Sequence, residues 1–411
     1  MKRLTRILRR MRATRLTWRR PPRGGVLVFD RYASDPITEL LARGSFEVFD
    51  NQFEVINVPV LLRTLLHGGR RWYDYCRQFV ALAQPRLLVS AIDSNAHVYT
   101  FETVSPSTKV VVIQNGIRGN VAPTPAGDVW STLQRQFPDV TPSVDLMLTL
   151  GEAHSSLYAR HVRGSTAAIG SIRNNAFIPA IGVGDRGRRR VAFISQYSGL
   201  DHCDIFPDGR SPALLTFVDS DGVTAETFHA VDGRVAGSVA RWCAAHGHDF
   251  TIIGRRTSAF PHERKFFDAW CGGTNHTFVP KGGETLSYEI AHDADLVVCI
   301  DSTLGYEMFA RGKRVAFVSA RGKHIGPTVG ADADLRVFRF GYPDVVDPTG
   351  PMWTSLDDDD EIRRVVEWAL DCDDETWRRA TAAIAPRVMT FDPGNARLRA
   401  ALVERGAVLA Q

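Results

Sequence analysis

Short apolar runs alternate with longer amphipathic segments along the chain from residue 25 onward. The runs are rich in Val, Ile, Leu and Phe, which is typical of buried strands. The segments between them place apolar residues at helical spacing, as in residues 70–83, where Pro85 ends the predicted helix. Strands that alternate with helices of this length indicate a parallel sheet in an α/β fold. The predicted strands of the first half are residues 26–29, 46–49, 54–58, 87–92, 109–113 and 146–150.

This alternation pauses in a stretch rich in Gly, Pro and Arg at residues 178–190, which we interpret as a linker. It then resumes, and the closing segments 361–371 and 375–388 are predicted to be helical. At 411 residues the chain is long enough for two cores. We therefore expect two consecutive parallel-sheet domains, residues 25–177 and 191–375, followed by C-terminal helices at 376–411. The predicted strands of the second half are residues 191–194, 250–253, 296–300 and 315–318, and its helices cover about 224–245, about 260–271 and a segment from Thr303.

Composition excludes several classes of protein. Hydrophobic residues make up 44% of the chain and charged residues 23%, as in ordinary globular domains. No run of about twenty apolar residues occurs, so we expect no membrane-spanning helix. The six cysteines are scattered without metal-ligand spacing, and the N-terminus lacks the pattern of a signal peptide. We expect a cytoplasmic protein without a structural metal or a cofactor.

Charge is concentrated at the N-terminus. Residues 1–24 hold ten of the 50 Lys and Arg residues and no acidic residue, so the rest of the chain has 40 basic and 46 acidic side chains. Aliphatic residues recur among these arginines at roughly helical spacing. A basic amphipathic segment of this kind suits an anionic membrane surface. A disordered basic arm is the alternative, and nucleic acid as a partner is disfavoured because the basic character stops at Arg23.

Polar residues directly after each strand are the candidate ligands, because open parallel sheets bind at this edge. The segment Asp301-Ser-Thr-Leu-Gly-Tyr-Glu307 follows a strongly apolar strand. Ser302 and Thr303 would start a helix whose free N–H groups attract anions, Gly305 would admit a phosphate, and Glu307 would reach ribose hydroxyls. The alternative is an ordinary helix start capped by Ser or Thr.

Two further candidates follow strands of the first domain. Asp93 comes after residues 87–92 and would act as a general base or nucleophile, or alternatively would cap the next helix. The segment Gln114-Asn115-Gly116 after residues 109–113 would form a tight turn facing a sugar or phosphate, with Arg118 pairing with a phosphate or an acceptor carboxylate.

The second domain adds basic candidates. Arg255 is placed to reach a diphosphate, and residues 281–284 (Lys-Gly-Gly-Glu) form another candidate anion loop. Asp201 and His202 offer a second acid and base pair. No Asp-x-Asp pair stands at a strand end, so metal-independent chemistry fits better. The chain has neither a Gly-x-Gly-x-x-Gly turn after the first strand nor a P-loop, which disfavours dehydrogenases and nucleotide hydrolases.

The segment from residue 296 to 317 resembles bacterial GT-B enzymes of surface-polysaccharide synthesis, in which a helix with a Ser/Thr start and a Glu holds the donor nucleotide. Residues 91–95 (Ala-Ile-Asp-Ser-Asn) and 110–118 (Val-Val-Val-Ile-Gln-Asn-Gly-Ile-Arg) resemble the first lobe of O-antigen and capsule biosynthesis proteins. The resemblance implies two Rossmann-like domains with an interdomain cleft. It also implies a donor site at Arg255, Ser302, Thr303, Gly305 and Glu307, and a catalytic Asp93.

The resulting prediction is a metal-independent glycosyltransferase at the inner face of the cell membrane. It would move a sugar from a nucleotide-sugar donor to a lipid-linked or glycan acceptor of lipopolysaccharide, O-antigen or capsule. A sugar-nucleotide 2-epimerase or a glycerophosphotransferase on the same scaffold is one alternative. A non-catalytic assembly protein is another, because the fold alone does not determine turnover.

Overall fold

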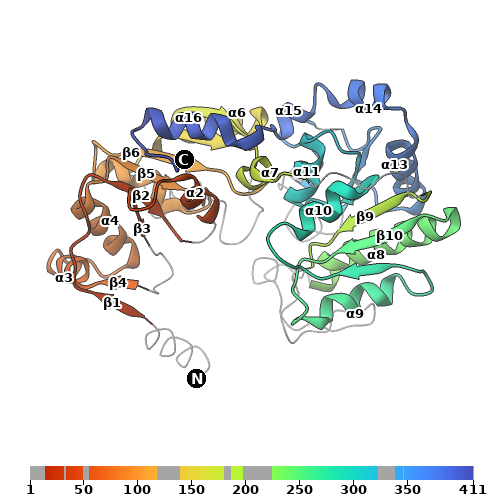
Figure 1. Ribbon diagram of the computed structural model, residues 1–411, viewed down its shortest axis with the longest axis horizontal. Helices are drawn as coiled ribbons and strands as arrows, with labels where there is room; N and C mark the ends of the chain where they lie inside the picture. The colour runs from red at the N-terminus through yellow and green to blue at the C-terminus, as the bar shows by residue number, and fades with distance from the viewer. Residues whose placement is uncertain are drawn as a thin grey trace.

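Two parallel sheets of six strands each form two lobes that lie side by side (Figure 1). The computed structural model describes residues 14–31, 34–49, 55–117, 139–179, 187–197, 225–322, 338–345 and 347–410, with side chains of the helix that starts at residue 225 described from residue 231. The elements lie in the predicted alternation of strands and helices. The α/β fold with two parallel sheets is therefore confirmed.

The N-terminal sheet has the strand order β3-β2-β5-β6-β7-β8. Its strands are β2 (Val26–Phe29), β3 (Phe46–Phe49), β5 (Leu87–Ser90), β6 (Lys109–Ile113), β7 (Ser143–Thr149) and β8 (Arg163–Ala168). The chain leaves β2 outward to β3 and returns to β5, so the strand order reverses between β2 and β5. The sequence did not predict β8, because this edge strand is exposed along half of its length and carries no apolar run.

Both faces of the N-terminal sheet are covered. Leu27 and Phe29 of β2 pack in one apolar cluster with α4, and Val26 and Val28 pack in the cluster on the opposite face. Alternate residues of one strand are thus buried on opposite sides, which explains its continuous apolar run. The helices of this lobe are α2 (Asp35–Leu40), α3 (Val58–Leu66), α4 (Trp72–Ala83), the 3-10 helix η1 (Ala96–Thr103), α6 (Glu152–Tyr158) and α7 (Ile172–Ala176).

A separate two-stranded sheet lies at the outer end of this lobe. Strand β1 (Arg15–Thr17) pairs in parallel with β4 (Val55–Asn57), and neither strand belongs to the large sheet. Part of the basic segment predicted as an arm is therefore a strand that is joined to the lobe. Residues 1–13 lie outside the described residues.

The C-terminal sheet has the order β11-β10-β9-β12-β13-β14 and reverses between β9 and β12. Its strands are β9 (Arg190–Ile194), β10 (Asp249–Ile253), β11 (Thr277–Val279), β12 (Leu296–Cys299), β13 (Val315–Val318) and β14 (Trp353–Thr354). The helices are α8 (Ala225–His246), α9 (Pro261–Trp270), α10 (Leu286–Asp293), α11 (Thr303–Ala310), α13 (Asp359–Asp371), α14 (Asp374–Thr381) and α15 (Ala385–Val388). The helix predicted over 375–388 is thus two helices, α14 and α15.

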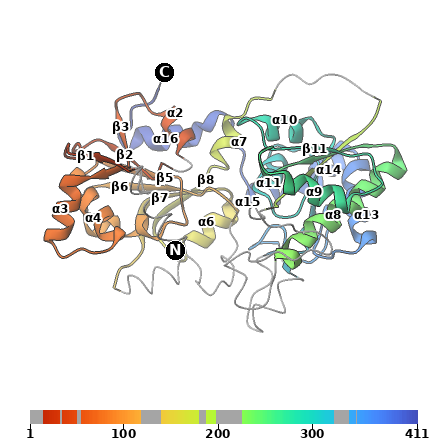
Figure 2. The same ribbon diagram turned by 90° about the horizontal axis from the view of Figure 1, so that it is seen from below.

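The chain ends on the N-terminal lobe. After α15 and the short 3-10 helix η5 (Pro393–Asn395), helix α16 (Ala396–Glu404) packs on the N-terminal sheet, as Figures 1 and 2 show. Gly170 lies at the crossing: its φ is +77°, and a Cβ there would lie 1.9 Å from the carbonyl oxygen of Thr390. Only glycine permits both this conformation and this close approach. The C-terminal segment therefore ties the two lobes together.

Candidate functional site

Helix α11 begins directly after β12, at the edge where the C-terminal sheet reverses its strand order. Ser302 is the N-cap residue, but its side chain makes no capping hydrogen bond to the helix. The first-turn N–H groups and the hydroxyls of Ser302 and Thr303 are half-buried at this edge. An N-terminus with this combination favours an anion.

Gly305 has a different role from the predicted one. A Cβ at this position would lie 2.4 Å from Sγ of Cys299 on the preceding strand. The residue is therefore small because α11 packs closely on β12, and not because a phosphate approaches it.

Two cavities adjoin this helix start. One, of about 330 Å³, lies at the carboxyl ends of β9, β10 and β12; we call it the carboxyl-edge cavity. The other, of about 320 Å³, has residues of both lobes in its wall; we call it the interlobe cavity. Gln196 and Thr303 line both, so the two cavities adjoin each other. The carboxyl-edge cavity is lined by Ser195, Arg255, Lys281, Ser287 and Ser302 among others.

Arg255 is held at this cavity from behind by a buried carboxylate that the sequence analysis missed. Glu263 on α9 accepts hydrogen bonds from the backbone N–H groups of Arg255 (2.8 Å) and Arg256 (2.7 Å) and from the Ser195 hydroxyl (2.5 Å). The Arg255 guanidinium donates to the carbonyl oxygen of Gln196 at 2.9 Å. Burial raises the pKa of Glu263 even though these donors oppose the shift. Glu263 thus fixes the loops after β9 and β10 relative to each other.

The loop after β6 meets the start of α11 across the lobes. The Ile117 N–H donates to Oγ1 of Thr303 at 3.4 Å, and Gly116 faces the same hydroxyl. Gln114 is buried and shapes this loop, because its amide donates to the Gly116 carbonyl at 2.8 Å and accepts from the Leu150 N–H at 3.0 Å. The two segments that resembled one family are therefore brought together. Arg118 lies outside the described residues.

Asp93 is enclosed behind this loop. Its Oδ1 accepts from the Asn115 N–H at 3.2 Å, and its Oδ2 accepts from the Tyr158 hydroxyl at 2.6 Å. The residue is fully buried and lines neither cavity. The alternative of a helix cap is wrong, because Asn95 is the residue that caps η1. A catalytic role of Asp93 stays a prediction, and the contacts present are those of a side chain that positions the Asn115 loop.

Glu307 lies at the junction of the lobes and not at the predicted ribose site. It is buried and forms side-chain hydrogen bonds with Ser171 of the N-terminal lobe and with Tyr288. Burial raises the pKa of its carboxyl group. One helical turn later, Arg311 donates to Oδ1 of Asn174 at 2.6 Å and also to the Phe177 carbonyl at 2.6 Å. The start of α11 therefore faces the cavities and its middle faces the junction of the lobes, which helical spacing alone did not reveal.

Of two acid–base residues in the interlobe cavity, the sequence analysis missed one and named the other only as the start of a candidate segment. His154, on α6 of the N-terminal lobe, is buried and lines this cavity. Asp301 lines it from the C-terminal lobe, and its carboxylate accepts from Nε of Arg321 at 2.7 Å. Arg321 is itself buried and paired with Asp232 at 2.9 Å. The spacing of polar residues after the strand that ends at Thr149 did not single out His154.

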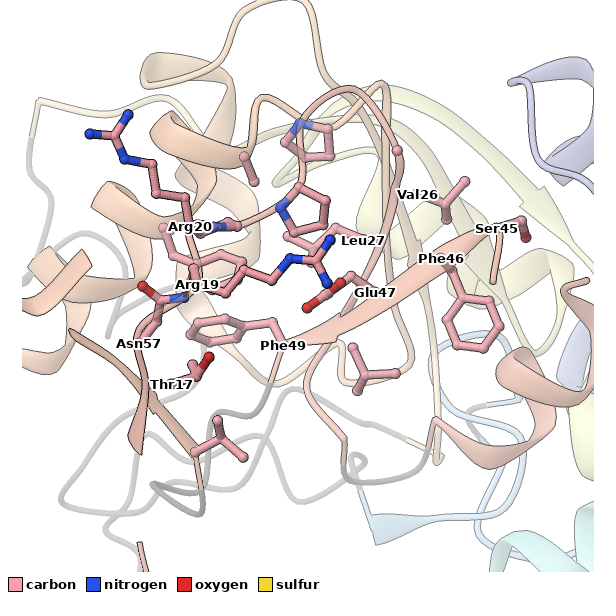
Figure 3. Close-up of a pocket in the computed structure, with 18 of the residues that line it drawn as sticks. Thr17, Arg19, Arg20, Val26, Leu27, Ser45, Phe46, Glu47, Phe49 and Asn57 are labelled. Atoms are coloured by element: carbon pink, nitrogen blue, oxygen red, sulfur yellow. Dashed lines mark hydrogen bonds between the residues drawn. The ribbon is translucent and has the colours of Figure 1, made fainter. Parts of the chain in front are cut away.

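A cavity of about 490 Å³ lies in the N-terminal lobe, away from this site (Figure 3). It is bounded by the residues at the amino ends of β2 and β5 and by the whole of β3. The side chains of Arg19 and Glu47 extend toward each other across it (Figure 3). Parallel sheets bind ligands at the opposite, carboxyl edge. This cavity therefore lies at the end of the sheet away from the candidate site.

The remaining sequence candidates contribute one residue, Lys281, to this site. Lys281 lines the carboxyl-edge cavity, as predicted for the 281–284 loop, whereas Asp201 and His202 lie outside the described residues. Within the described ranges, no group of three His, Cys, Asp or Glu side chains could hold a metal ion. In the same part of the chain, no helix combines the length and apolarity needed to cross a bilayer.

The two sheets, their strand orders and the site at their facing carboxyl edges define a protein of the GT-B type. The chain belongs to a family described as "putative O-antigen biosynthesis protein", whose family model matches residues 111–405. Curated proteins give no significant match.

Among solved structures, the chain is similar to one titled "putative UDP-N-acetylglucosamine 2-epimerase from Listeria monocytogenes", at 11% identity and a TM-score of 0.52, covering 93% of this chain and 96% of that one. It is also similar to MnaA of S. aureus with UDP (9% identity, TM-score 0.51, covering 92% and 95%). A third match is the wall teichoic acid polymerase TagF (9% identity, TM-score 0.50, covering 93% and 88%). At these identities the likeness supports the fold alone.

Proposed function

We propose that this protein is a metal-independent glycosyltransferase that moves a sugar from a nucleotide-sugar donor to an acceptor in lipopolysaccharide, O-antigen or capsule synthesis. One observation carries the proposal. The loop after β6 in the N-terminal lobe and the start of α11 in the C-terminal lobe meet at adjoining cavities, one rich in anion-binding groups and the other open to both lobes. A transferase needs this arrangement, because donor and acceptor must meet between the lobes.

The donor diphosphate would occupy the carboxyl-edge cavity. Ser302 and Thr303 offer hydroxyls at the N-terminus of α11, and Arg255 and Lys281 supply positive charge. These groups can stabilise the negative charge that develops on the leaving nucleotide. We propose a uridine diphosphate sugar as the first donor to test, because MnaA, a similar fold, was solved with UDP.

The acceptor would approach through the interlobe cavity. We propose His154 as the group that takes the proton from the acceptor hydroxyl, because it lines this cavity from the N-terminal lobe. Asp301 faces the same space with its carboxylate fixed by Arg321, and would orient the acceptor or the reacting sugar. Asp93 acts in this proposal through the Asn115 loop and not by contact with substrate.

A thermal-shift panel of UDP-, GDP-, dTDP- and CMP-sugars tests the donor site, since a ligand that binds only the folded state raises its stability. The protein is then incubated with the preferred donor, carrying a labelled sugar, and with membrane lipids from a cell that makes the polysaccharide. The label that appears in the lipid or glycan fraction is measured. Donor-dependent transfer is expected. Binding of no nucleotide in the panel would contradict the proposal.

The likeness to 2-epimerases favours one second candidate, a sugar-nucleotide 2-epimerase. An epimerase converts its donor without any acceptor, whereas a transferase needs one. A donor-only incubation analysed by chromatography separates the two. The likeness to TagF leaves a glycerophosphotransferase as a further alternative to test. Donor binding without any turnover would indicate a non-catalytic assembly protein.

We place the working protein at the inner face of the cell membrane. Ten cations and no acidic residue in residues 1–24 support this localisation. Removal of residues 1–13 is expected to weaken binding to anionic vesicles, and the full chain should lose affinity as salt rises. Salt-independent binding would contradict an electrostatic arm.

A further inference from the structure

Large apolar side chains are exposed at the outer end of the N-terminal lobe. Among the described residues with exposed large hydrophobic side chains, five lie on β1, just after it, or on α3. They are Leu16 (56% exposed), Trp18 (72%), Leu62 (52%), Leu65 (58%) and Leu66 (85%), which we call the outer patch. Soluble proteins expose single apolar residues routinely, but several on neighbouring elements mark a surface that contacts something apolar.

Helix α3 shows why this surface is unusual. Leu62, Leu65 and Leu66 stand at positions i, i+3 and i+4 and share one face of the helix. Val60 and Thr64 occupy the buried face toward the lobe. A helix on a protein surface normally presents polar residues outward. Here the outward face carries leucines instead.

The strand part and the helix part of the outer patch are joined through Asn57. Its Oδ1 caps α3 by accepting from the Val60 N–H at 3.2 Å, and its Nδ2 donates to the Arg19 carbonyl at 2.7 Å. Thr17 lines the cavity under β1, and side chains alternate along a strand, so Leu16 faces away from that cavity. Trp18, just after the strand, is exposed and is not among the residues that line the cavity. Figure 1 shows α3, β4 and β1 together at the end of the lobe farthest from the C-terminal lobe.

Positive charge surrounds the outer patch. Arg15, Arg20, Arg63, Arg70 and Arg71 are all exposed on the same elements and the segments next to them, whereas Arg19 extends toward Glu47 across the adjacent cavity (Figure 3). Residues 14–29 and 55–73 contain no acidic side chain. Tryptophan and leucine within a cationic surface are the composition of an element that lies in the headgroup region of a membrane.

We propose that the outer patch docks on an anionic lipid bilayer, with the leucines of α3 and Trp18 inserted among the headgroups and the arginines paired with lipid phosphates. This deepens the membrane localisation in the proposed function by assigning it to a folded surface outside residues 1–13. A second copy of this chain is a poor occupant, because a twofold contact would bring arginines against arginines with no acidic partner.

The test uses the full chain and sedimentation with vesicles of phosphatidylethanolamine and phosphatidylglycerol. The variant Leu62→Ser/Leu65→Ser/Leu66→Ser keeps every charge and should bind at least about tenfold more weakly, since each leucine loses its apolar contact with the membrane. The matched control, Val403→Ser on α16, removes a side chain of similar exposure (53%) elsewhere and should bind like the parent. Unchanged melting temperatures show that both variants fold.

Two results would overturn the proposal. One is parental vesicle binding by the triple variant, which would leave the basic segment as the sole contact. The other is a concentration-dependent dimer that the triple variant loses, which would make the patch a surface for self-association. The emission of Trp18 is obtained by subtracting the fluorescence spectrum of Trp18→Phe from that of the parent. This emission should shift to the blue when the protein binds vesicles, and the absence of a shift would also contradict insertion. None of these measurements uses donor or acceptor, so a failed transfer assay and a failed docking site are distinguishable.

Discussion

The Ile117 N–H of the N-terminal lobe donates to the Thr303 hydroxyl of the C-terminal lobe at 3.4 Å. This contact joins the two polar loops that the sequence placed 186 positions apart. It lies where the carboxyl-edge and interlobe cavities meet, so one hydroxyl is shared between the lobe contact and the proposed phosphate. When a phosphate of the nucleotide-sugar accepts a hydrogen bond from the Thr303 hydroxyl, it is therefore one bond away from the Ile117 N–H of the N-terminal lobe.

Replacing Thr303 by Val removes this hydroxyl and keeps the branched shape. A lost hydrogen bond to a charged phosphate costs about 1.5–3 kcal/mol, so nucleotide affinity should fall about 10- to 150-fold. Thr303→Ser retains the hydroxyl and serves as the control, which should bind within a few-fold of the parent. Calorimetric titration with the best nucleotide of the panel measures both. Equal affinities for the Val variant and the parent would remove Thr303 from the donor site.

Glu263 should control nucleotide affinity without touching the nucleotide. Glu263→Ala removes the acceptor for the Arg255 and Arg256 N–H groups and for the Ser195 hydroxyl, so both loops of the donor site lose their fixed position. We expect about tenfold or greater loss of affinity and a lower melting temperature. Glu39→Gln, at an exposed position of α2 in the N-terminal lobe, is the control. If Glu263→Ala binds nucleotide as tightly as the parent, the loops after β9 and β10 keep their positions without Glu263.

The sequence was sufficient for the central strands of both sheets, because buried strands are apolar, but not for the edge strands β8, β11 and β14. It also placed the candidate loops at one edge, because the polar residues after parallel strands converge there. It was insufficient where a side chain's direction decides its role. Glu307 and Thr303 lie on the same helix, yet Glu307 faces the junction of the lobes and Thr303 faces the cavities. The role of Glu263 could not be predicted from the sequence, because this residue follows no strand and its partners include backbone N–H groups, which any residue provides.

The stability of the lobe junction should depend on pH through Glu307. Its pKa is raised in the folded state, so folding favours the protonated form. Stability is then greatest below the ordinary glutamic acid pKa of 4.5 and falls as pH rises from there to the raised value. Glu307→Gln removes this pH-dependent contribution to stability, because the glutamine side chain does not titrate.

The melting temperature of Glu307→Gln relative to the parent should therefore increase from pH 4 to pH 8, by about 1 °C for each kcal/mol in a chain of 411 residues. Glu284→Gln, which is exposed, should give a constant difference over the same range. Parallel pH profiles for the parent and the Glu307 variant would show that Glu307 does not carry the effect.

His154 should carry the proton transfer in the proposed reaction. His154→Asn keeps a polar side chain on α6 but cannot act as a base near neutral pH. General-base catalysis contributes about 100- to 10,000-fold, so kcat should fall at least 100-fold while nucleotide affinity is retained. The exposed His161, one turn beyond α6, provides the control His161→Asn. A rise in the Kd for nucleotide that accompanies the fall in kcat would place His154 in donor binding instead.

Asp93 separates a positioning role from a chemical one. Its carboxylate holds the Asn115 N–H at 3.2 Å and the Tyr158 hydroxyl at 2.6 Å, and it is fully buried. In Asp93→Asn, one oxygen still accepts from Asn115, but an NH2 group then faces Tyr158. We expect a lower melting temperature and about a tenfold loss of transfer, because the loop that contacts Thr303 is less well fixed.

Tyr158→Phe makes this test decisive, because it removes one of the two contacts and leaves the carboxylate intact. If Asp93 positions the loop, Tyr158→Phe should reproduce part of the loss in both stability and transfer. If Asp93 is instead the base or nucleophile, Asp93→Asn should lose at least about 100-fold in kcat at a parental melting temperature, and Tyr158→Phe should stay nearly as active as the parent. Single-turnover rates and melting curves for the two variants give opposite patterns under the two hypotheses. The buried geometry predicts the first pattern, in which the lost activity follows the lost stability.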